Sequence, residues 1–255
     1  MRLTNIFNNK SDLLSVYFTA GFPELNSTIS VLEALENAGV DFVEVGMPFS
    51  DPVADGPTIQ GSSTHALNNG ISLKLLFEQL EEAKKRVSFP LILMGYFNPI
   101  LKFGVERFVE RCVECDIQGV ILPDMPYEIY DEKYRHIFEK RGVFPIFLIT
   151  PQTTDERIKL LDENSSLFLY MVSSSSVTGK SSGNNMQQLA YFKRVAEMKL
   201  KSPVMTGFGI SDNKSFKRVC GYTNGAIIGS AYVSAIKNSV DIESDTLSFV
   251  KRIRG

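Results

Sequence analysis

Eight short apolar runs, each followed by a longer amphipathic segment, constrain the fold of this chain most strongly. The runs are rich in β-branched and aromatic residues, which favour strands. They cover residues 13–20, 40–46, 90–96, 117–124, 143–150, 166–173, 203–209 and 225–230. Between them apolar residues recur at helical spacing; in the first such segment Val31 and Leu35 share a face, and Gly39 ends the helix. This alternation predicts βαβ units and parallel strands.

The number of units favours a closed barrel over an open sheet. The chain has 255 residues, and a (β/α)8 barrel takes about 250. An open sheet that binds a dinucleotide carries G-x-G-x-x-G after its first strand, whereas residues 19–24 read TAGFPE, and no P-loop occurs in the sequence. No linker or change of composition divides the chain. We therefore expect an α/β protein in which residues 1–255 form a single (β/α)8 TIM barrel, with a short N-terminal helix.

Composition and charge exclude several classes of protein. Lys and Arg number 27 and Asp and Glu 29, which gives a formal charge of −2, whereas nucleic-acid binders carry a basic face. The longest apolar runs are strand-sized, shorter than the roughly 20 residues that span a bilayer. Residues 1–12 lack the apolar core of a signal peptide. We expect a cytoplasmic protein that binds neither nucleic acid nor a membrane.

The cysteines are expected to pack rather than to bind metal. Cys112 and Cys115 form a C-x-x-C pair, a spacing found in zinc and redox sites. No second pair follows, and the only histidines, His65 and His136, are distant in sequence. Because the pair lies in a helical pattern, both thiols are predicted to be core residues, and no metal site is expected.

Two carboxyl groups near the second predicted strand are candidate catalytic groups. Strand residues alternate between the barrel interior and the helices; Val43 and Val45 suit the helix side, so Glu44 is predicted to point inward. A buried carboxylate is costly unless it is paired or protonated, and the alternative is a structural glutamate satisfied by its neighbours. The stiff loop at residues 47–61 brings Asp55 above the same strand. Two carboxyl groups in different surroundings can divide acid and base roles.

Tyr170 and a set of glycines complete the candidate site. Tyr170 has the parity of an inward residue on the sixth strand, although a core tyrosine that donates to a carbonyl is the alternative. Glycines follow the last three strands, where such barrels build phosphate sites from backbone N–H groups. They are Gly179, Gly209 and Gly229, the last followed by Ser230. Glycine lets the backbone approach an anion closely, so these loops predict a phosphate site.

A polar segment follows the sixth strand. Residues 173–188 are rich in Ser, Gly and Asn and show no apolar period, so a loop is predicted there. We expect residues 179–187 to be mobile without ligand and to close over bound phosphate, which brings Thr178 towards the active site.

A series of motifs resembles the tryptophan synthase alpha subunit family. The run EVGMPFSDPVADGP, from Glu44 to Pro57, is similar to the signature of that family. Further similar motifs are TAGFP at 19–23, GYFNPI at 95–100, LPDMP at 122–126, GFGIS at 207–211 and IIGSA at 227–231. They follow the order of the family along nearly the whole chain.

The resemblance implies a reaction and roles for particular residues. The reaction of the family is a retro-aldol cleavage of indole-3-glycerol phosphate to indole and glyceraldehyde 3-phosphate, which needs no metal or organic cofactor in this chain. The catalytic carboxylates of the family match Glu44, expected to shuttle protons, and Asp55, expected to stabilise positive charge at the indole N–H. Its active-site tyrosine matches Tyr170. The remaining matches are Gly179, Gly209, Gly229 and Ser230 for phosphate, and Tyr17, Ile59, Leu122 and Ile227 for the indole pocket.

The resemblance also implies a partner. Alpha subunits of this family dock on a beta subunit that carries pyridoxal phosphate and condenses the indole with serine, so an alpha2-beta2 complex is expected. The matching contact positions are Asp51, Pro52, Asn98, Pro99 and Pro126.

Three other functions are possible for this sequence, and it differs from the family pattern in two places. The chain could be an inactive alpha-like barrel kept as a binding partner, another phosphate-binding barrel enzyme, or an indole producer that works without a beta subunit. The intact Glu44 and Asp55 favour an enzyme. Ser174 and Ser176 stand where the family usually has Arg and Gly, and Tyr17 stands where Phe is more common. Loss of that glycine changes the backbone freedom of the sixth-strand loop.

Overall fold

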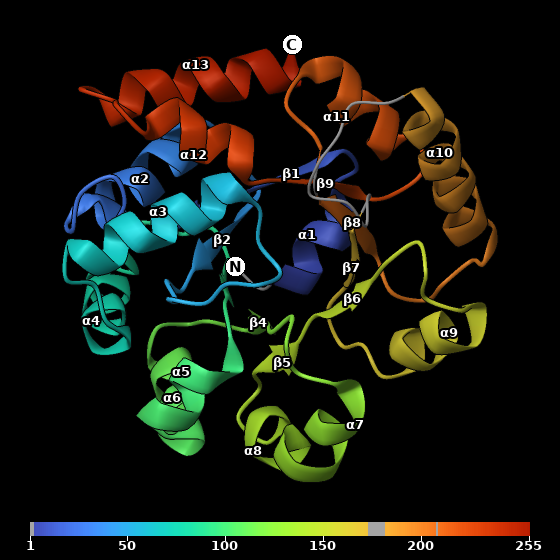
Figure 1. The fold of residues 1–255 in the computed structure, drawn as a ribbon, viewed down its shortest axis with the longest axis horizontal. Helices are drawn as coiled ribbons and strands as arrows, with labels where there is room; N and C mark the ends of the chain where they lie inside the picture. Colours follow the sequence, from blue (N-terminus) through green and yellow to red (C-terminus); the bar gives the residue numbers. More distant parts are fainter. Residues whose placement is uncertain (1–2, 173–181, 208) are drawn as a thin grey trace.

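Nine parallel strands form one sheet that closes into a barrel (Figure 1). The computed structural model describes residues 3–172, 182–207 and 209–255. The strands are β1 (Leu13–Thr19), β2 (Phe42–Gly46), β3 (Leu91–Met94), β4 (Gly119–Ile121), β5 (Phe144–Pro145), β6 (Phe147–Ile149), β7 (Leu169–Val172), β8 (Val204–Gly207) and β9 (Gly225–Ile228). Their order is β5-β4-β3-β2-β1-β9-β8-β7-β6. Every predicted apolar run contributes a strand to the sheet.

The fifth apolar run closes the barrel. It forms the two short strands β5 and β6, which lie at opposite ends of the strand order. Only Ile146 separates them, and its N–H donates to the carbonyl of Val120 at 2.9 Å. Pro145 has no N–H to give to a ladder, which favours a break at this point. Since β5 pairs with β4 and β6 pairs with β7, one run joins both edges and the predicted (β/α)8 barrel is confirmed.

Helices surround the barrel in a ring (Figure 1). They are α1 (Leu3–Asn9), α2 (Ser27–Asn37), α3 (Pro57–Asn68), α4 (Leu73–Ala83), α5 (Phe97–Phe103), α6 (Val105–Glu114), α7 (Tyr127–Ile129), the π-helical turn η1 (Tyr130–Tyr134), α8 (Arg135–Glu139), α9 (Asp155–Glu163), α10 (Ser182–Glu197), α11 (Asn213–Cys220), α12 (Ser230–Ile236) and α13 (Ile242–Arg254). In α2 the predicted face of Val31 and Leu35 is fully buried. Gly39 follows α2 with φ +79°, a conformation that favours glycine.

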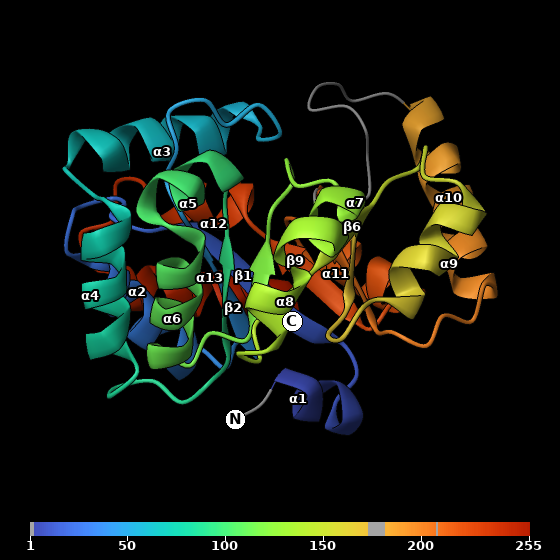
Figure 2. The ribbon, with the colours of Figure 1, turned by 90° about the horizontal axis from the view of Figure 1, so that it is seen from below.

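The short N-terminal helix closes the end of the barrel opposite α3 (Figure 2). Phe7 on α1 packs on the rings of Phe42 and Phe168, with centroids 6.2 and 5.5 Å away. Those two rings also contact each other at 5.7 Å. Because Phe42 and Phe168 share the parity of Glu44 and Tyr170 on their strands, this cluster forms the floor of the barrel beneath the candidate catalytic residues.

The predicted polar loop is shorter than expected. Residues 182–188, assigned to a loop from their Ser, Gly and Asn content, form the first turns of α10. Small polar residues are tolerated in a first turn, where backbone N–H groups have no partner in the helix. The helix is stabilised further along by Tyr191, Phe192 and Val195, which are buried. Residues 173–181, which include the first three residues of the predicted mobile segment 179–187, lie outside the described residues.

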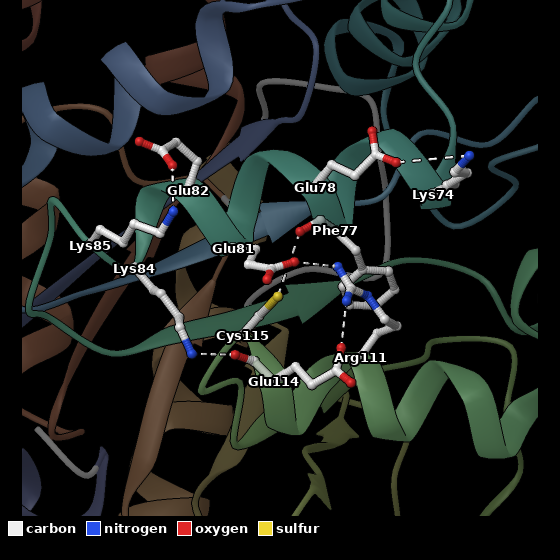
Figure 3. A network of polar contacts seen from close by, with 10 residues as sticks. All are labelled: Lys74, Phe77, Glu78, Glu81, Glu82, Lys84, Lys85, Arg111, Glu114 and Cys115. Carbon is white, nitrogen blue, oxygen red and sulfur yellow. Dashed lines mark hydrogen bonds and ion pairs between the residues drawn. The ribbon is translucent and has the colours of Figure 1, made fainter.

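Helices α4 and α6 are joined by an ion pair on the outer surface (Figure 3). Arg111 contacts Glu81 across the helices at 3.0 Å and Glu114 within α6. Beneath them the Cys115 thiol donates to the carbonyl of Phe77 at 3.6 Å. Cys112 is also buried, so both thiols of the C-x-x-C pair belong to the core, as predicted. Within the described ranges no group of three or more His, Cys, Asp and Glu side chains could hold a metal ion, and no helix is long and apolar enough to cross a membrane.

Candidate active site

A cavity of about 210 Å³ at the carboxyl ends of the strands brings most of the predicted residues together. The candidate catalytic residues Glu44, Asp55 and Tyr170 all line it. The other predicted residues in its wall are Tyr17, Ile59, Gly209, Ile227, Gly229 and Ser230. Sequence reasoning did not include Met94, Ile210, Ser211 and Ala231, which complete the lining. Thr178, Gly179, Ser174 and Ser176 lie outside the described residues.

Two larger surface grooves contain none of the predicted site residues. One, of about 740 Å³, runs between α2 and the turn before α13 and is lined by charged groups such as Glu33 and Arg86. The other, of about 670 Å³, lies at the amino ends of the strands near Lys84 and Arg141. Neither contains a buried carboxyl group. Because perturbed titratable groups mark functional sites better than volume does, the smaller cavity is the candidate.

Two tyrosines cross the cavity over glycines of the neighbouring strand. A Cβ atom on Gly46 would lie 2.2 Å from the hydroxyl oxygen of Tyr17, and one on Gly207 would lie 2.0 Å from that of Tyr170. The two pairs have the same register: each glycine is paired with the residue two positions after the tyrosine, Thr19 or Val172. Glycine is therefore required at these positions because a side chain would occupy the space of a phenol ring.

Glu44 is a buried carboxyl group without a hydrogen-bond partner among the described residues. It is fully inaccessible to solvent, and burial raises its pKa well above the usual value for a glutamate. Loss of hydration penalises the charged form of a carboxyl group. Burial therefore favours the neutral acid form of Glu44, and no described residue occupies either of its oxygen atoms with a hydrogen bond.

Asp55 lies in a different environment in the same cavity. Burial raises its pKa to about 6, while a hydrogen bond donated by the Tyr96 hydroxyl at 3.1 Å lowers it. At neutral pH most of Asp55 is therefore ionised, whereas burial shifts Glu44 towards its protonated form. Two carboxyl groups with separated pKa values are suited to distinct roles, one as proton donor and one as anion.

The last two strands supply the end of the cavity predicted to bind phosphate. Gly209 adopts φ +73°, a conformation that favours glycine. Gly229 precedes α12, whose first N–H groups have no acceptor within the helix. A Cβ atom on Gly229 would lie 3.3 Å from the Tyr17 ring, so the backbone here is packed against the cavity wall.

Leu122 does not lie in this cavity. It lines a separate apolar cavity of about 200 Å³ between the sheet and α7, η1 and α9, beside Tyr127 and Phe147. The register explains the difference: Ile121, not Leu122, pairs with the inward Met94. Leu122 is the next residue and therefore faces the helices.

Sequence reasoning missed Tyr96, whose hydroxyl contacts the candidate catalytic group Asp55 directly. It occurs in the motif at 95–100, which was noted only for its resemblance. Its parity, two residues after the inward Met94, was the available signal. That Tyr96 reaches Asp55 depends on how the loops after β2 and β3 meet, which no local pattern specifies.

A (β/α)8 barrel with two carboxyl groups of different pKa in one cavity at the carboxyl ends of its strands is an enzyme scaffold for proton-transfer chemistry. Comparison with known proteins gives the particular family. The family model for the tryptophan synthase alpha chain matches residues 3–253. The chain is 51% identical over 253 residues to the tryptophan synthase alpha chain of Christiangramia forsetii, covering 99% of this chain and 98% of the relative. It is 49% identical over 247 residues to that of Bacteroides thetaiotaomicron, covering 96% of each.

Solved structures agree. The alpha subunit of tryptophan synthase from Legionella pneumophila superposes with a TM-score of 0.88 at 31% identity, covering 99% of this chain and 95% of that chain. A chain of tryptophan synthase from M. tuberculosis, in an aminoacrylate-bound form, gives 0.86 at 26% identity, covering 99% and 97%. The chain belongs to the tryptophan synthase alpha chain family. It is an enzyme that catalyses the lyase reaction of this family: the cleavage of indole-3-glycerol phosphate, which supplies indole to a beta subunit.

Proposed function

We propose that Glu44 and Asp55 carry out the carbon–carbon cleavage of indole-3-glycerol phosphate as acid–base group and electrostatic stabiliser. The observation that supports this most strongly is their difference in one cavity: Glu44 is neutral and unpartnered among the described residues, and Asp55 is hydrogen-bonded and largely ionised. An inactive barrel has no physical reason to keep an unpartnered buried carboxyl group, which costs free energy.

The proposed reaction begins with proton donation. Because an indole carbon is a poor leaving carbanion, neutral Glu44 protonates C3, which forms a cationic indolenine. The Asp55 carboxylate lies by the indole N–H and stabilises this positive charge. Glu44, now a carboxylate, accepts the proton of the hydroxyl on the adjacent glycerol carbon. The electrons of that O–H bond form the aldehyde carbonyl, the carbon–carbon bond breaks, and its electrons neutralise the ring. Indole and glyceraldehyde 3-phosphate leave, and Glu44 is protonated again.

The remaining predicted residues are proposed to bind the two ends of the substrate. The backbone at Gly209, Gly229 and Ser230 suits an anion, as argued above. Tyr17, Ile59 and Ile227 supply apolar surface for the indole ring, and Tyr170 is proposed to assist from the opposite wall. Thr178 and Gly179 keep their predicted roles in closure and phosphate binding as part of the proposal.

The proposed chemistry needs no metal or organic cofactor in this chain, because each step moves a proton between groups that the chain supplies. Pyridoxal phosphate is assigned to the beta subunit. We propose an alpha2-beta2 complex, a cytoplasmic location as for a biosynthetic enzyme, and one domain over residues 1–255. Asp51, Asn98 and Pro126 are exposed and Pro52 is buried. Val53, on the same loop, is 84% exposed, which supports a docking face there.

Indole release from indole-3-glycerol phosphate tests the proposal, with and without a beta subunit. Glu44→Gln and Asp55→Asn should each lower turnover on the order of 100-fold or more, because the amides keep shape but cannot transfer the proton or supply the charge. Glu78→Gln is a matched control, since Glu78 is exposed on α4. Near-normal turnover by either active-site variant would remove that residue from the mechanism. No indole release by the wild type under any condition would support the inactive-barrel alternative.

A further inference from the structure

Tyr96 joins two turns at the mouth of the barrel. It stands between β3 and α5, and its side chain is buried with its ring 5.2 Å from that of Phe49. Its hydroxyl accepts the backbone N–H of Ala54 at 2.9 Å and contacts Asp55 Oδ2 at 3.1 Å. One hydroxyl group thus holds both the backbone and the side chain of the loop that carries Asp55.

The direction of these bonds is fixed by the available hydrogens. The Ala54 N–H can only donate, so it uses a lone pair of the phenol oxygen. The single phenol hydrogen therefore goes to the Asp55 carboxylate. A hydrogen bond donated to a carboxylate stabilises its ionised form. Among the described residues, Tyr96 is the only hydrogen-bond donor to the Asp55 side chain.

Asp124 fixes the turn that carries Tyr96. Both of its carboxylate oxygens accept the backbone N–H of Phe97 at 3.0 Å. Phe97 is the first residue of α5, so this contact ties the end of β4 to the start of that helix. Tyr96 immediately precedes Phe97, so the contact with Asp124 also holds the backbone beside Tyr96.

We infer that Tyr96 is a positioning residue for Asp55, holding the carboxylate in place and in its ionised form, and that Asp124 holds Tyr96 in turn. The inference rests on the proposed function of Asp55. A carboxylate on a loop needs such support, because small displacements of a catalytic group cost large factors in rate.

The other groups around Asp55 cannot replace this contact. Glu44, Tyr17 and Tyr170 line the same cavity, and burial raises the pKa of each, which favours its neutral form. Asp124 accepts the Phe97 N–H, and its charge raises the pKa of Tyr96. The described lining of the cavity contains no Lys, Arg or His. Tyr96 therefore opposes the effect of burial on Asp55 without help from a cation.

The test is the pH profile of kcat/KM for the full chain with Tyr96→Phe. The acid limb of the wild type should report Asp55, with a midpoint near its pKa of about 6. Without the donated bond the limb should move up by about one pH unit, so the ionised fraction of Asp55 and with it kcat/KM at pH 7 should fall about twofold from the change in ionisation. Loss of positioning should lower kcat/KM further at every pH. Part of that loss should be recovered at higher pH, where Asp55 ionises even without Tyr96.

Matched variants separate positioning from general damage. Tyr232→Phe removes an equally buried hydroxyl, which bonds Thr246 at 2.8 Å between α12 and α13, and should leave the limb in place. Asp124→Ala should move the limb in the same direction as Tyr96→Phe, and Asp124→Asn, which keeps one acceptor for Phe97, should restore it. The carboxyl NMR shift of Asp55, assigned with Asp55→Asn, gives the pKa directly even in a variant of low activity.

The outcomes distinguish the two proposals. If Asp55→Asn retains turnover, the proposed function of Asp55 is wrong. If Asp55→Asn loses turnover while Tyr96→Phe keeps the limb and the NMR pKa within about 0.2 unit of the wild type, only the role of Tyr96 is overturned.

Discussion

Tyr17 and Glu44 are register partners on adjacent strands, and both side chains point into the barrel. The Tyr17 hydroxyl lies 3.4 Å from Thr19 Oγ1, which is 2.6 Å from Ser62 Oγ. Since Ser62 donates to the carbonyl of Ile59 at 2.9 Å, the hydrogens of Thr19 and Tyr17 point along this chain, away from the cavity. Tyr17 therefore presents only lone pairs to the cavity that Glu44 also lines.

The packing of Tyr17 predicts the effect of Gly46→Ala. The new Cβ would lie 2.2 Å from the Tyr17 hydroxyl oxygen, so the ring must move. We expect a loss of about 1–3 kcal/mol in the free energy of unfolding, measured by urea denaturation, because overpacking forces side chains from their rotamers. Gly61→Ala on α3 is the control, since a Cβ there meets nothing within 4 Å and alanine favours a helix. Equal stability of the two variants would show that the ring has room to shift.

Glu44 predicts a pH-dependent stability difference. The pKa of Glu44 is raised in the folded state. The contribution of its neutral form to the free energy of unfolding is therefore fully present below the unfolded pKa, and it is lost as the pH rises through the folded pKa. Glu44→Gln removes this ionisation. Relative to the wild type, the variant should gain about 1.4 kcal/mol per pH unit above roughly pH 4.5 until the folded pKa is reached. Urea denaturation from pH 4.5 to 8 measures it, with Glu78→Gln as a flat control. A constant difference would show that Glu44 is not held neutral.

The contacts of Asp41 predict that it makes the main electrostatic contribution to the free energy of unfolding. It is buried and accepts from the Leu14 N–H at 2.8 Å, from Lys10 at 2.8 Å and from Arg254 at 2.6 Å. It thereby ties the first strand to the last helix. Asp41→Ala leaves the buried Leu14 N–H without this partner, and we expect a loss of about 1–3 kcal/mol in the free energy of unfolding, measured by urea denaturation. Glu78→Ala, which removes an exposed ion pair with Lys74 within α4, should cost less than about 1 kcal/mol. Similar losses would contradict this ranking.

Val53 predicts the partner surface. It is 84% exposed on the loop between β2 and α3, beside the exposed Asp51. Val53→Asp should weaken binding of a beta subunit at least roughly tenfold, measured by calorimetry, because burying a charge replaces burying an apolar side chain. Leu101→Asp is the control, since Leu101 is exposed on α5 outside the predicted contacts. If Val53→Asp binds a beta subunit with unchanged affinity, the docking face does not include Val53.

The strands and the position of Glu44 follow from local patterns, because alternation within a strand decides which side chains point inward. The failures have equally local causes. The resemblance places Leu122 in the pocket, whereas Leu122 follows the inward Ile121 and faces the helices. Helix α10 begins within a stretch whose composition indicates a loop. The Tyr17–Gly46 and Tyr96–Asp55 contacts each join neighbouring strands or loops. They depend on register and loop path, which become definite only when the barrel closes.

Exchange of the C3 hydrogen of indole with deuterium oxide tests the central claim, that Glu44 transfers a proton to C3, most directly. NMR follows the exchange with indole and glycerol phosphate bound, so that carbon–carbon cleavage plays no part. The wild type should catalyse it, and Glu44→Gln should be slower by on the order of 100-fold while binding indole with similar affinity. Exchange by Glu44→Gln at the wild-type rate would contradict the account.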